Sequence, residues 1–355
     1  MIHKLLHRLT AIPFITTVAL LLSSCNGLIY DDEGDCTPHY TVSFFYDRNI
    51  KSADAFKNEV NSVSLYVFDK TGNLVWEKTE SGDILKTDGY AMEVPVAPGT
   101  YDVIAWCHYY KDRATGFTLR GQNSIGTLSD LHCTVDRLRD ASGKAYTRSD
   151  LHSLYHGSLK SVEFPEKEGR HDFKISLTKN TNTVRVMLQQ INGKPLDKDD
   201  FDFYLTSANG SMDHFNRLND NETIDYRAWS KKSGTAGMPE LEDRDEDRSG
   251  DETITTLSAV VAEMTTARLV KGEPVTLFVT RRGATKPIVR LPVIDYALMV
   301  KGEYPRPMSD QDYLDCQDEY PLTFFLDENN DWKKTEGIYV SSWHVVLNST
   351  ELNSN

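Results

Sequence analysis

The sequence has few cations, no long apolar run and no closely spaced cysteine pair, and each shortage argues against a class of protein. The apolar stretch Ala11–Leu22 is shorter than the roughly 20 residues of a membrane-spanning helix, and no other stretch approaches that length. Acidic residues outnumber basic ones, 53 to 39, for a formal net charge of −14. Such a chain repels a phosphate backbone, which argues against nucleic acid as a partner.

The first residues have the features of an export signal. Lys4 and Arg8 form a basic head before the short apolar stretch, and small residues precede Cys25. We therefore expect residues 1–24 to be a removable lipoprotein signal, Cys25 to be lipidated, and residues 25–37 to form an acidic tether. Two or more acyl chains anchor a protein stably without a membrane-spanning helix. The alternative is an ordinary signal peptide with an accidental cysteine.

Four cysteines remain besides the predicted lipid site: Cys36, Cys107, Cys133 and Cys316. An exported protein lives where disulfides persist, so up to two bridges are possible, in three connectivities that the sequence does not distinguish. None of them forms a Cys-x-x-Cys pair, so neither a redox motif nor a zinc ribbon is indicated. Structural bridges and buried thiols both remain open.

Motifs for metal binding or catalysis are incomplete. The segment 327–331 has the spacing that opens a calcium loop, but Ile338 stands where that loop needs a glutamate, so a hairpin turn is favoured. His152 and His156 are four apart, yet Ser153 replaces the glutamate of a zinc-protease helix, and loop histidines are favoured. No nucleophile-elbow or phosphate-loop pattern occurs. We expect no enzymatic activity, no cofactor and no metal.

Short strands with turn signals between them fill most of the chain. Tyr40–Tyr46 alternates, with Val42 and Phe44 on one face, and residues 61–76 form a hairpin around the turn 69–73. Residues 91–107 are predicted to form a second hairpin. No segment keeps a 3.6-residue period over four turns, so the sequence predicts an all-β sandwich or barrel with little helix.

A break near residues 179–181 divides the strands into two sets. We therefore predict an N-terminal β-sandwich over 38–179 and a C-terminal β-sandwich over 180–355. Residues 108–155 are polar and low in β-branched residues, which predicts a long connection with one short helix. Residues 231–252 combine glycines with a run of charges, which predicts a solvated charged loop.

Aromatic side chains are the remaining candidates for a binding surface, because they can stack on sugars. In a β-sandwich most aromatics fill the core or cross-strand pairs. We expect Trp106 in the core, and Tyr109, Tyr110 and Trp332 to be exposed, without assigning them to a site. The full set comprises Trp76, Tyr90, Trp106, Tyr109, Tyr110, Trp229 and Trp332.

Several short segments, in order, resemble a known family. They begin at the lipid site with Cys25-Asn26-Gly27-Leu28-Ile29-Tyr30-Asp31-Asp32, followed by Cys36, Phe45-Tyr46-Asp47, Ala53–Phe56, Val63–Asp69 with Gly72, Ala97–Tyr101, Ala105-Trp106, and Ile338–Val340 with Trp343 near the end. In this order and spacing the chain resembles the FimB-type fimbrial subunits, the lipoprotein anchors of minor and major fimbriae in Bacteroides-type bacteria. The resemblance is good over residues 25–110 and thin over 200–330.

The resemblance implies two tandem transthyretin-like sandwiches and a place at the base of a pilus, where the chain holds the fibre to the outer membrane and limits its length. It also implies shaft subunits as partners by strand exchange, and no catalytic or cofactor residues. In shaft subunits an arginine after the first strand is cut to open a groove, and Arg48 lies near that place. The acidic run Asp31–Asp35 resembles a signal for the outer face of the outer membrane.

Two alternatives to the anchor stay open on the same fold. One is a surface lipoprotein that binds glycans, and the other is an adhesin at the tip of the fibre. An anchor that keeps its own first strand would end the chain of exchanged strands, but the sequence does not decide whether that strand is kept.

Overall fold

The computed structural model describes residues 37–107, 115–120, 125–190, 192–219, 222–239, 254–303 and 307–345. Strands dominate these residues, and among them no helix is long and apolar enough to cross a membrane. The predicted all-β class with sandwich architecture is confirmed. The short helical elements are α3 (Phe56–Glu59), α4 (Val293–Met299), α5 (Asp310–Cys316) and the 3-10 turns η1 (Asp83–Lys86), η2 (Leu128–Asp130), η3 (Lys198–Asp200), η4 (Lys301–Glu303) and η5 (Lys334–Glu336).

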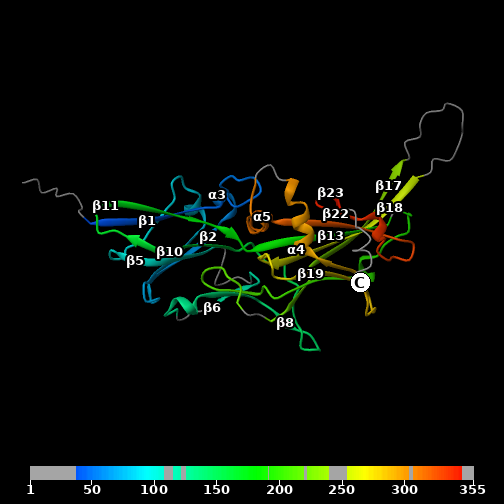
Figure 1. Ribbon diagram of the computed structural model, residues 1–355, viewed down its shortest axis with the longest axis horizontal. Helices are drawn as coiled ribbons and strands as arrows, with labels where there is room; N and C mark the ends of the chain where they lie inside the picture. Colours follow the sequence, from blue (N-terminus) through cyan, green and yellow to red (C-terminus); the bar gives the residue numbers. More distant parts are fainter. Residues whose placement is uncertain are drawn as a thin grey trace, which may run out of the picture.

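The N-terminal half packs two sheets face to face (Figure 1). The first, here the β1 sheet, has the order β11 (Gly169–Ser176), β1 (Pro38–Phe45) and β4 (Met92–Glu93). The second, the β5 sheet, has the order β12 (Thr178–Lys179), β10 (Tyr155–Phe164), β5 (Gly99–Cys107), β2 (Ser62–Asp69) and β3 (Leu74–Ser81). Alternating apolar residues from both sheets fill the core between them, as the sequence predicted for Val42 and Phe44.

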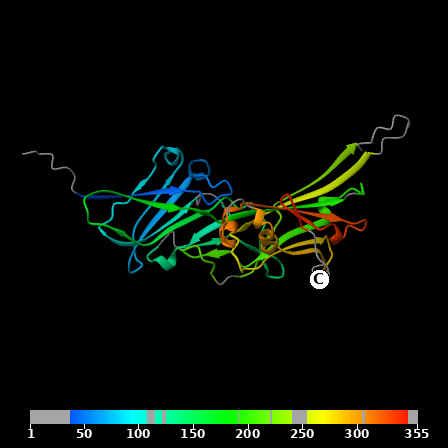
Figure 2. The same ribbon diagram turned by 45° about the horizontal axis from the view of Figure 1, so that its top comes forward.

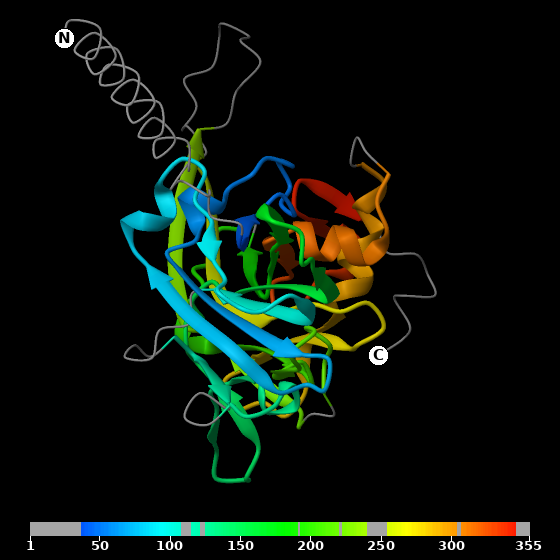
Figure 3. The same ribbon diagram turned by 90° about the vertical axis from the view of Figure 1, so that its left-hand side faces the viewer.

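The C-terminal half packs two six-stranded sheets. The β13 sheet has the order β17 (Ser230–Pro239), β18 (Ile254–Ala267), β13 (Thr181–Gln190), β21 (Glu319–Leu326), β22 (Ile338–Val340) and β23 (Trp343–Val345). The β14 sheet has the order β20 (Pro287–Pro292), β19 (Val275–Arg281), β14 (Phe201–Ser207), β16 (Ile224–Arg227), β9 (Ala145–Thr147) and β8 (Leu138–Arg139). Figure 3 shows α4 and α5, in orange, together on one side of the molecule.

A small third layer links the halves. The β7 sheet has the order β15 (Ser211–Met212), β7 (His132–Val135) and β6 (Phe117–Arg120). Its apolar residues belong to the same buried cluster as Trp106 of β5 and as the inner faces of the C-terminal sheets. The β5 sheet is therefore covered on both faces, and the two halves lie end to end in an elongated molecule (Figure 2).

Two predictions about the strands are wrong. Residues 91–107 do not form a hairpin, because β4 pairs with β1 whereas β5 pairs with β2 and β10. The segment 108–155 is not a plain connection: its described residues form β6 to β9 and η2. Their short runs showed little alternation in the sequence, and they hold strand geometry by pairing with distant partners, β9 with β16 and β7 with β15.

The predicted sandwich border at residues 179/180 remains a proposal. Leu177 belongs to the smaller core and Val184 to the larger one. However, β8 and β9 lie in the β14 sheet, although their residue numbers fall within 38–179. The predicted charged loop 231–252 also begins later, because Ser230–Pro239 is β17, paired along its whole length with β18. Backbone pairing with the longer strand overrides the loop-like composition of this segment.

The hairpin at residues 61–76 is confirmed as β2 and β3. The backbone N–H of Gly72 donates to the carbonyl of Asp69 at 2.8 Å, with the glycine φ at 84°, a conformation that costs a glycine little. The described cysteines Cys107, Cys133 and Cys316 are buried thiols with no disulfide among them. Cys25 and Cys36 lie outside the described residues.

Candidate functional site

The first strand lies fully inside its own sandwich. β1 pairs with β11 in parallel along all eight residues, from Pro38 to Phe45, and with β4 on its other side. Tyr40, Val42 and Phe44 point into the core with at most 6% of each side chain exposed. The Tyr40 hydroxyl donates to the carbonyl of Pro165 at 2.7 Å, and that of Ser43 to the carbonyl of Phe173 at 3.1 Å.

A tight turn follows β1 and contains Arg48. The buried Asn49 donates from Nδ2 to the carbonyls of Tyr46 and Ala53, at 2.9 and 2.7 Å. The backbone N–H of Tyr46 donates to Oδ1 of Asp54 at 2.9 Å. Side-chain hydrogen bonds thus fix the backbone on both sides of Arg48, as expected for Asn and Asp in turns.

A buried carboxylate joins this turn to the C-terminal half. Arg268 donates from Nε and Nη2 to the two carboxylate oxygens of Asp315, at 2.8 and 2.7 Å, in the two-point geometry that strengthens such pairs. Arg48 Nη1 lies 3.7 Å from Oδ2 of the same carboxylate. Asp315 is 4% exposed, so its charge depends on these partners.

A second cluster lies beside the first. Lys179 Nζ is 3.0 Å from Oδ2 of Asp318, and the Tyr46 hydroxyl donates to the other oxygen at 3.4 Å. Burial raises the pKa of Asp318 above its ordinary value, and Lys179 opposes that rise. The Tyr155 hydroxyl donates to Glu59 at 2.7 Å. These contacts join the end of β1 and β12 to the residue before β21, and join β10 to α3.

Neutral polar groups complete this contact between the two halves, which together with the two ionic clusters we call the joint. Asn180 and Asn216 exchange two amide hydrogen bonds, at 2.7 and 3.0 Å. Burial lowers the pKa of His156 to about 4, so its ring is neutral at physiological pH. The ring Nε2 lies 2.9 Å from the carbonyl of His214, and the ring packs edge-on against Trp106. His156 is therefore a buried strand residue and not the loop histidine that the sequence predicted.

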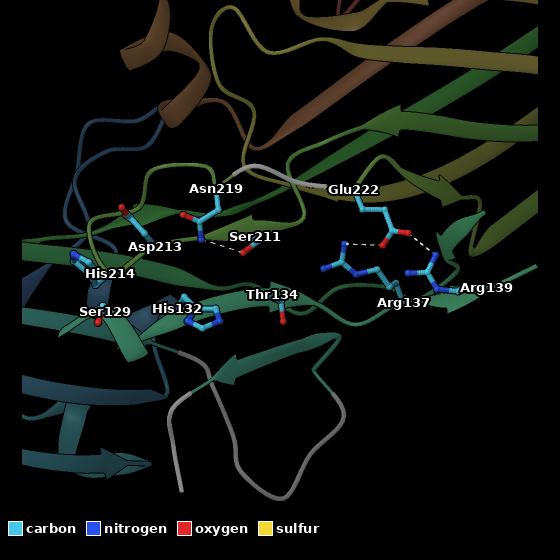
Figure 4. A pocket seen from close by; sticks show the side chains of 10 residues that line it. All are labelled: Ser129, His132, Thr134, Arg137, Arg139, Ser211, Asp213, His214, Asn219 and Glu222. Atoms are coloured by element: carbon cyan, nitrogen blue, oxygen red, sulfur yellow. Dashed lines mark hydrogen bonds and ion pairs between the residues drawn. The ribbon is translucent and has the colours of Figure 1, made fainter. Parts of the chain in front are cut away.

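An open polar groove of about 800 Å³ lies over the β7 sheet (Figure 4). Arg137 and Arg139 both pair with Glu222 at one end, and Asn219 donates to the Ser211 hydroxyl at 3.3 Å. The groove is lined by Ser129, His132, Thr134, Arg137, Arg139, Ser211, Asp213, His214, Asn219 and Glu222. None of these residues is Phe, Tyr or Trp, and both guanidinium groups pair with Glu222.

Among the described residues, no cluster of three or more His, Cys, Asp or Glu side chains is arranged to hold a metal ion. The segment 327–331 is a turn, with the backbone N–H of Asp327 donating to the carbonyl of Asp331 at 2.8 Å, as predicted. Trp106 is fully buried, as predicted, but Trp332 is not exposed: it packs edge-on against Phe324. The predicted site residue Cys25 lies outside the described residues, so the geometry of a lipid site is not part of this structure.

Known proteins similar to this chain include fimbrial proteins and candidate adhesins. A sequence model of the family described as "Fimbrillin-A associated anchor proteins Mfa1 and Mfa2" matches residues 32–349. The minor fimbrium anchoring subunit Mfa2 of Porphyromonas gingivalis is 24% identical over 210 residues. That match covers 57% of this chain and 60% of the relative, so the chain matches less than two thirds of that relative's length.

Solved structures share the fold across nearly the whole chain. A candidate adhesin from Bacteroides thetaiotaomicron is 29% identical with a TM-score of 0.72, and the match covers 89% of this chain and 100% of that one. A candidate polysaccharide-binding protein from the same bacterium is 28% identical with a TM-score of 0.70, covering 88% and 99%. The fimbrial anchor protein Mfa2 from P. gingivalis is 19% identical with a TM-score of 0.61, covering 88% and 100%.

Proposed function

The chain belongs to the family of fimbrillin-A associated anchor proteins, and from that premise we propose that it is the lipid-anchored subunit that holds a fimbrial fibre at the outer membrane and limits its length. Cys25 is the proposed lipid attachment site, reached after removal of residues 1–24. The acidic run Asp31–Asp35 favours the outer face of that membrane. The observation that carries the proposal is the position of β1.

A first strand that is paired within its own subunit is consistent with a subunit that ends the fibre. In strand exchange an extended segment of one subunit completes the sheet of another. Here β1 already occupies the place between β11 and β4, so a partner strand finds no vacancy there. An adhesin at the distal tip with an unoccupied partner groove fits this arrangement less well. We propose that shaft subunits join at another edge, or receive a strand from this chain.

The turn after β1 favours an uncut chain. A protease binds its substrate as an extended segment, whereas Arg48 lies in a turn whose backbone Asn49 and Asp54 hold by hydrogen bonds. The guanidinium of Arg48 also faces the buried carboxylate of Asp315. Cleavage at Arg48 would require this turn to open first, so we propose that β1 stays covalently joined to the rest of the sandwich.

The direction of the chain suits a tether. β1 begins at the end of the elongated molecule that is far from the β13 and β14 sheets (Figures 1 and 2). A pull between a lipid before β1 and a fibre bound to the C-terminal half therefore passes through both sandwiches and the polar joint. Because the β5 sheet packs against a different core on each of its two faces, it favours transmission of that load without separation of the halves.

The proposal is tested by deleting the gene in the source bacterium and restoring either the wild-type chain or the Cys25→Ala variant. We expect deletion to release fibres into the medium and the released fibres to be longer than normal. The wild type restores attachment and length, whereas Cys25→Ala yields chain that no longer sediments with membranes. Immunoblots of medium and membranes measure release, and electron microscopy measures length.

A Cys36→Ala variant is the matched control, because it removes a nearby cysteine and leaves the lipid site intact. It should attach fibres as the wild type does. Fibres that stay attached at normal length in the deletion strain would contradict the anchor role. Mass spectrometry that finds Cys25 unmodified would contradict the lipid anchor separately.

A further inference from the structure

One tryptophan is both exposed and held in a fixed orientation. Trp229, 38% exposed, lies in the short crossing between β16 and β17. Its backbone N–H donates to the carbonyl of Glu263 at 3.1 Å, and its indole Nε1 donates to Oγ1 of Thr265 at 3.1 Å. Because both ends of the residue are fixed, little conformational entropy of this side chain is lost when a ligand stacks on the ring.

A polar pocket of about 320 Å³, near the lower limit of ordinary ligand pockets, is lined in part by Thr265, whose hydroxyl accepts the hydrogen bond from the Trp229 indole. Three neighbouring strands of the β13 sheet supply its floor, since Thr183 pairs in register with Thr265 on one side and with Glu319 on the other. Asp150 accepts a hydrogen bond from the Thr265 hydroxyl at 3.1 Å, so one threonine connects the indole to the pocket wall.

The pocket offers both donors and acceptors, with an excess of negative charge. Lys179 is its one ammonium group and is engaged by Asp318 at 3.0 Å, which leaves the carboxylates of Asp150 and Glu319 without a cation in the pocket. Thr181, a residue 4% exposed, lines the same pocket, and its buried hydroxyl has no hydrogen-bond partner among the described residues. Such a lining repels anions and suits an uncharged ligand rich in hydroxyl groups.

Trp229, 38% exposed, differs in its surroundings from other aromatic rings of the C-terminal half. No ring or cation among the described residues covers Trp229. On the β14 sheet Tyr204 and Phe278 stack on each other with centroids 5.1 Å apart, and the Arg227 guanidinium lies 4.0 Å from the Tyr146 centroid. An open aromatic face carries partial negative charge, which attracts the C–H groups on the apolar side of a sugar ring.

We propose that Trp229 and the pocket beside Thr265 bind a sugar unit of a neutral polysaccharide. The sugar ring stacks on the indole, and the hydroxyl groups of the sugar form hydrogen bonds with Asp150, Thr183 and Glu319. This site is separate from the anchoring role, because it uses neither β1 nor the lipid cysteine. It gives the cell-surface protein a second contact, with glycan rather than with the fibre.

The test uses the full chain, purified in detergent, in native gels that contain dextran, laminarin or galactomannan, with dextran sulfate as the anionic comparison. We expect at least one neutral polysaccharide to retard the wild type and the sulfated one to have no effect. Trp229→Ala should weaken the retardation about tenfold or more, and Thr265→Val should weaken it less. Trp343→Ala, which removes another exposed tryptophan, should leave it unchanged.

Absence of retardation by all three neutral polysaccharides would overturn the proposal. Equal losses in Trp229→Ala and Trp343→Ala would overturn it as well. Circular dichroism of each variant checks folding, and Trp229→Phe, which keeps an aromatic face, should retain part of the binding. None of these outcomes depends on fibre attachment, so the anchor role and the sugar site stand or fall separately.

Discussion

The strands of the β5 sheet and those of the C-terminal sheets are buried in different ways. In β2 seven of eight residues are buried, on both faces, whereas β14 alternates strictly between buried and accessible positions. Strands covered on both faces lose the alternation that marks a half-buried sheet. One face of the β5 sheet fills the smaller core and the other joins the larger core, so the two halves share a sheet and should unfold together.

Trp106→Ala should give the largest effect on this coupling. The side chain is fully buried on the face of β5 that belongs to the larger core, and its removal leaves a large cavity. We expect a loss of about 3–5 kcal/mol in the free energy of unfolding, with a single transition for both halves. Thermal and denaturant unfolding measure this, and Trp343→Ala is the exposed control. A variant whose N-terminal half melts separately at the wild-type temperature would disprove the coupling.

Asp315→Asn should be the next largest. It removes the buried carboxylate charge that pairs with the partly buried Arg268, and leaves that cation unmatched at the joint. We expect a loss of about 3 kcal/mol in the free energy of unfolding, and partial recovery in the double variant with Arg268→Met. Glu336→Gln breaks the exposed pair with Lys333 and should cost far less. Equal losses at the two positions would show that burial of the joint pair is unimportant.

Acidification should destabilise the joint through its histidines before the exposed carboxylates are protonated. Burial lowers the pKa of His156 to about 4, from an ordinary 6.5, and also lowers that of His214. As the pH falls, these histidines are protonated in the unfolded chain before they are protonated in the folded chain. Their contribution to the free energy of unfolding is therefore complete above about pH 6.5 and is lost as the pH falls toward 4, by roughly 3 kcal/mol for His156. Asp318 acts in the opposite direction, because burial raises its pKa.

The measurement is the free energy of unfolding between pH 7 and 4.5, for the wild type and for His156→Gln. The variant should show a flatter dependence on pH. Hydrogen bonds and cations hold the pKa values of Asp140 and Asp310 at about 2. Their contribution to the free energy of unfolding is therefore lost only below the pH range of this measurement. An unchanged pH slope in the variant would mean that His156 is not the group responsible.

Arg48→Ala should have the smallest effect on stability. The side chain is half exposed and its distance to Asp315 is 3.7 Å, so we expect a loss of at most about 1 kcal/mol. Limited digestion by an arginine-specific protease provides a second measurement. The wild type should resist cleavage at residue 48, whereas Asn49→Ala, which loses the hydrogen bonds of the turn, should be cut faster. Rapid cleavage of the wild type at residue 48 would contradict the retained first strand.

The sequence predicted the strands whose burial alternates. Val42 and Phe44 in β1 lie in the core that their spacing indicated. It failed for β6 to β9, which are too short to show a period, and of which β7 and β9 pair with β15 and β16 across 77 to 79 residues of chain. It also failed for residues 91–107, because turn residues predict that the chain reverses but not which strands become neighbours.

The candidate sugar site shows the same limit. Trp229 was one of seven aromatics with no distinguishing pattern, and the sequence favoured Trp332 as exposed. Exposure depends on what folds over a ring, and here Phe324 packs against Trp332 whereas Trp229 stays open. The pocket beside it combines residues of β13, β18 and β21 with Asp150 from a loop far away in the chain.

The sequence by itself determined the β class, the acidic charge and the predicted lipid site, because these depend on composition, local spacing and a few adjacent residues. Only the tertiary structure decided that β1 is paired between β11 and β4, that one sheet is shared by two cores, and that Trp229 is exposed whereas Trp332 is not. Each of these depends on contacts between segments far apart in the chain. Such contacts are set by packing and strand pairing together, which no local pattern encodes.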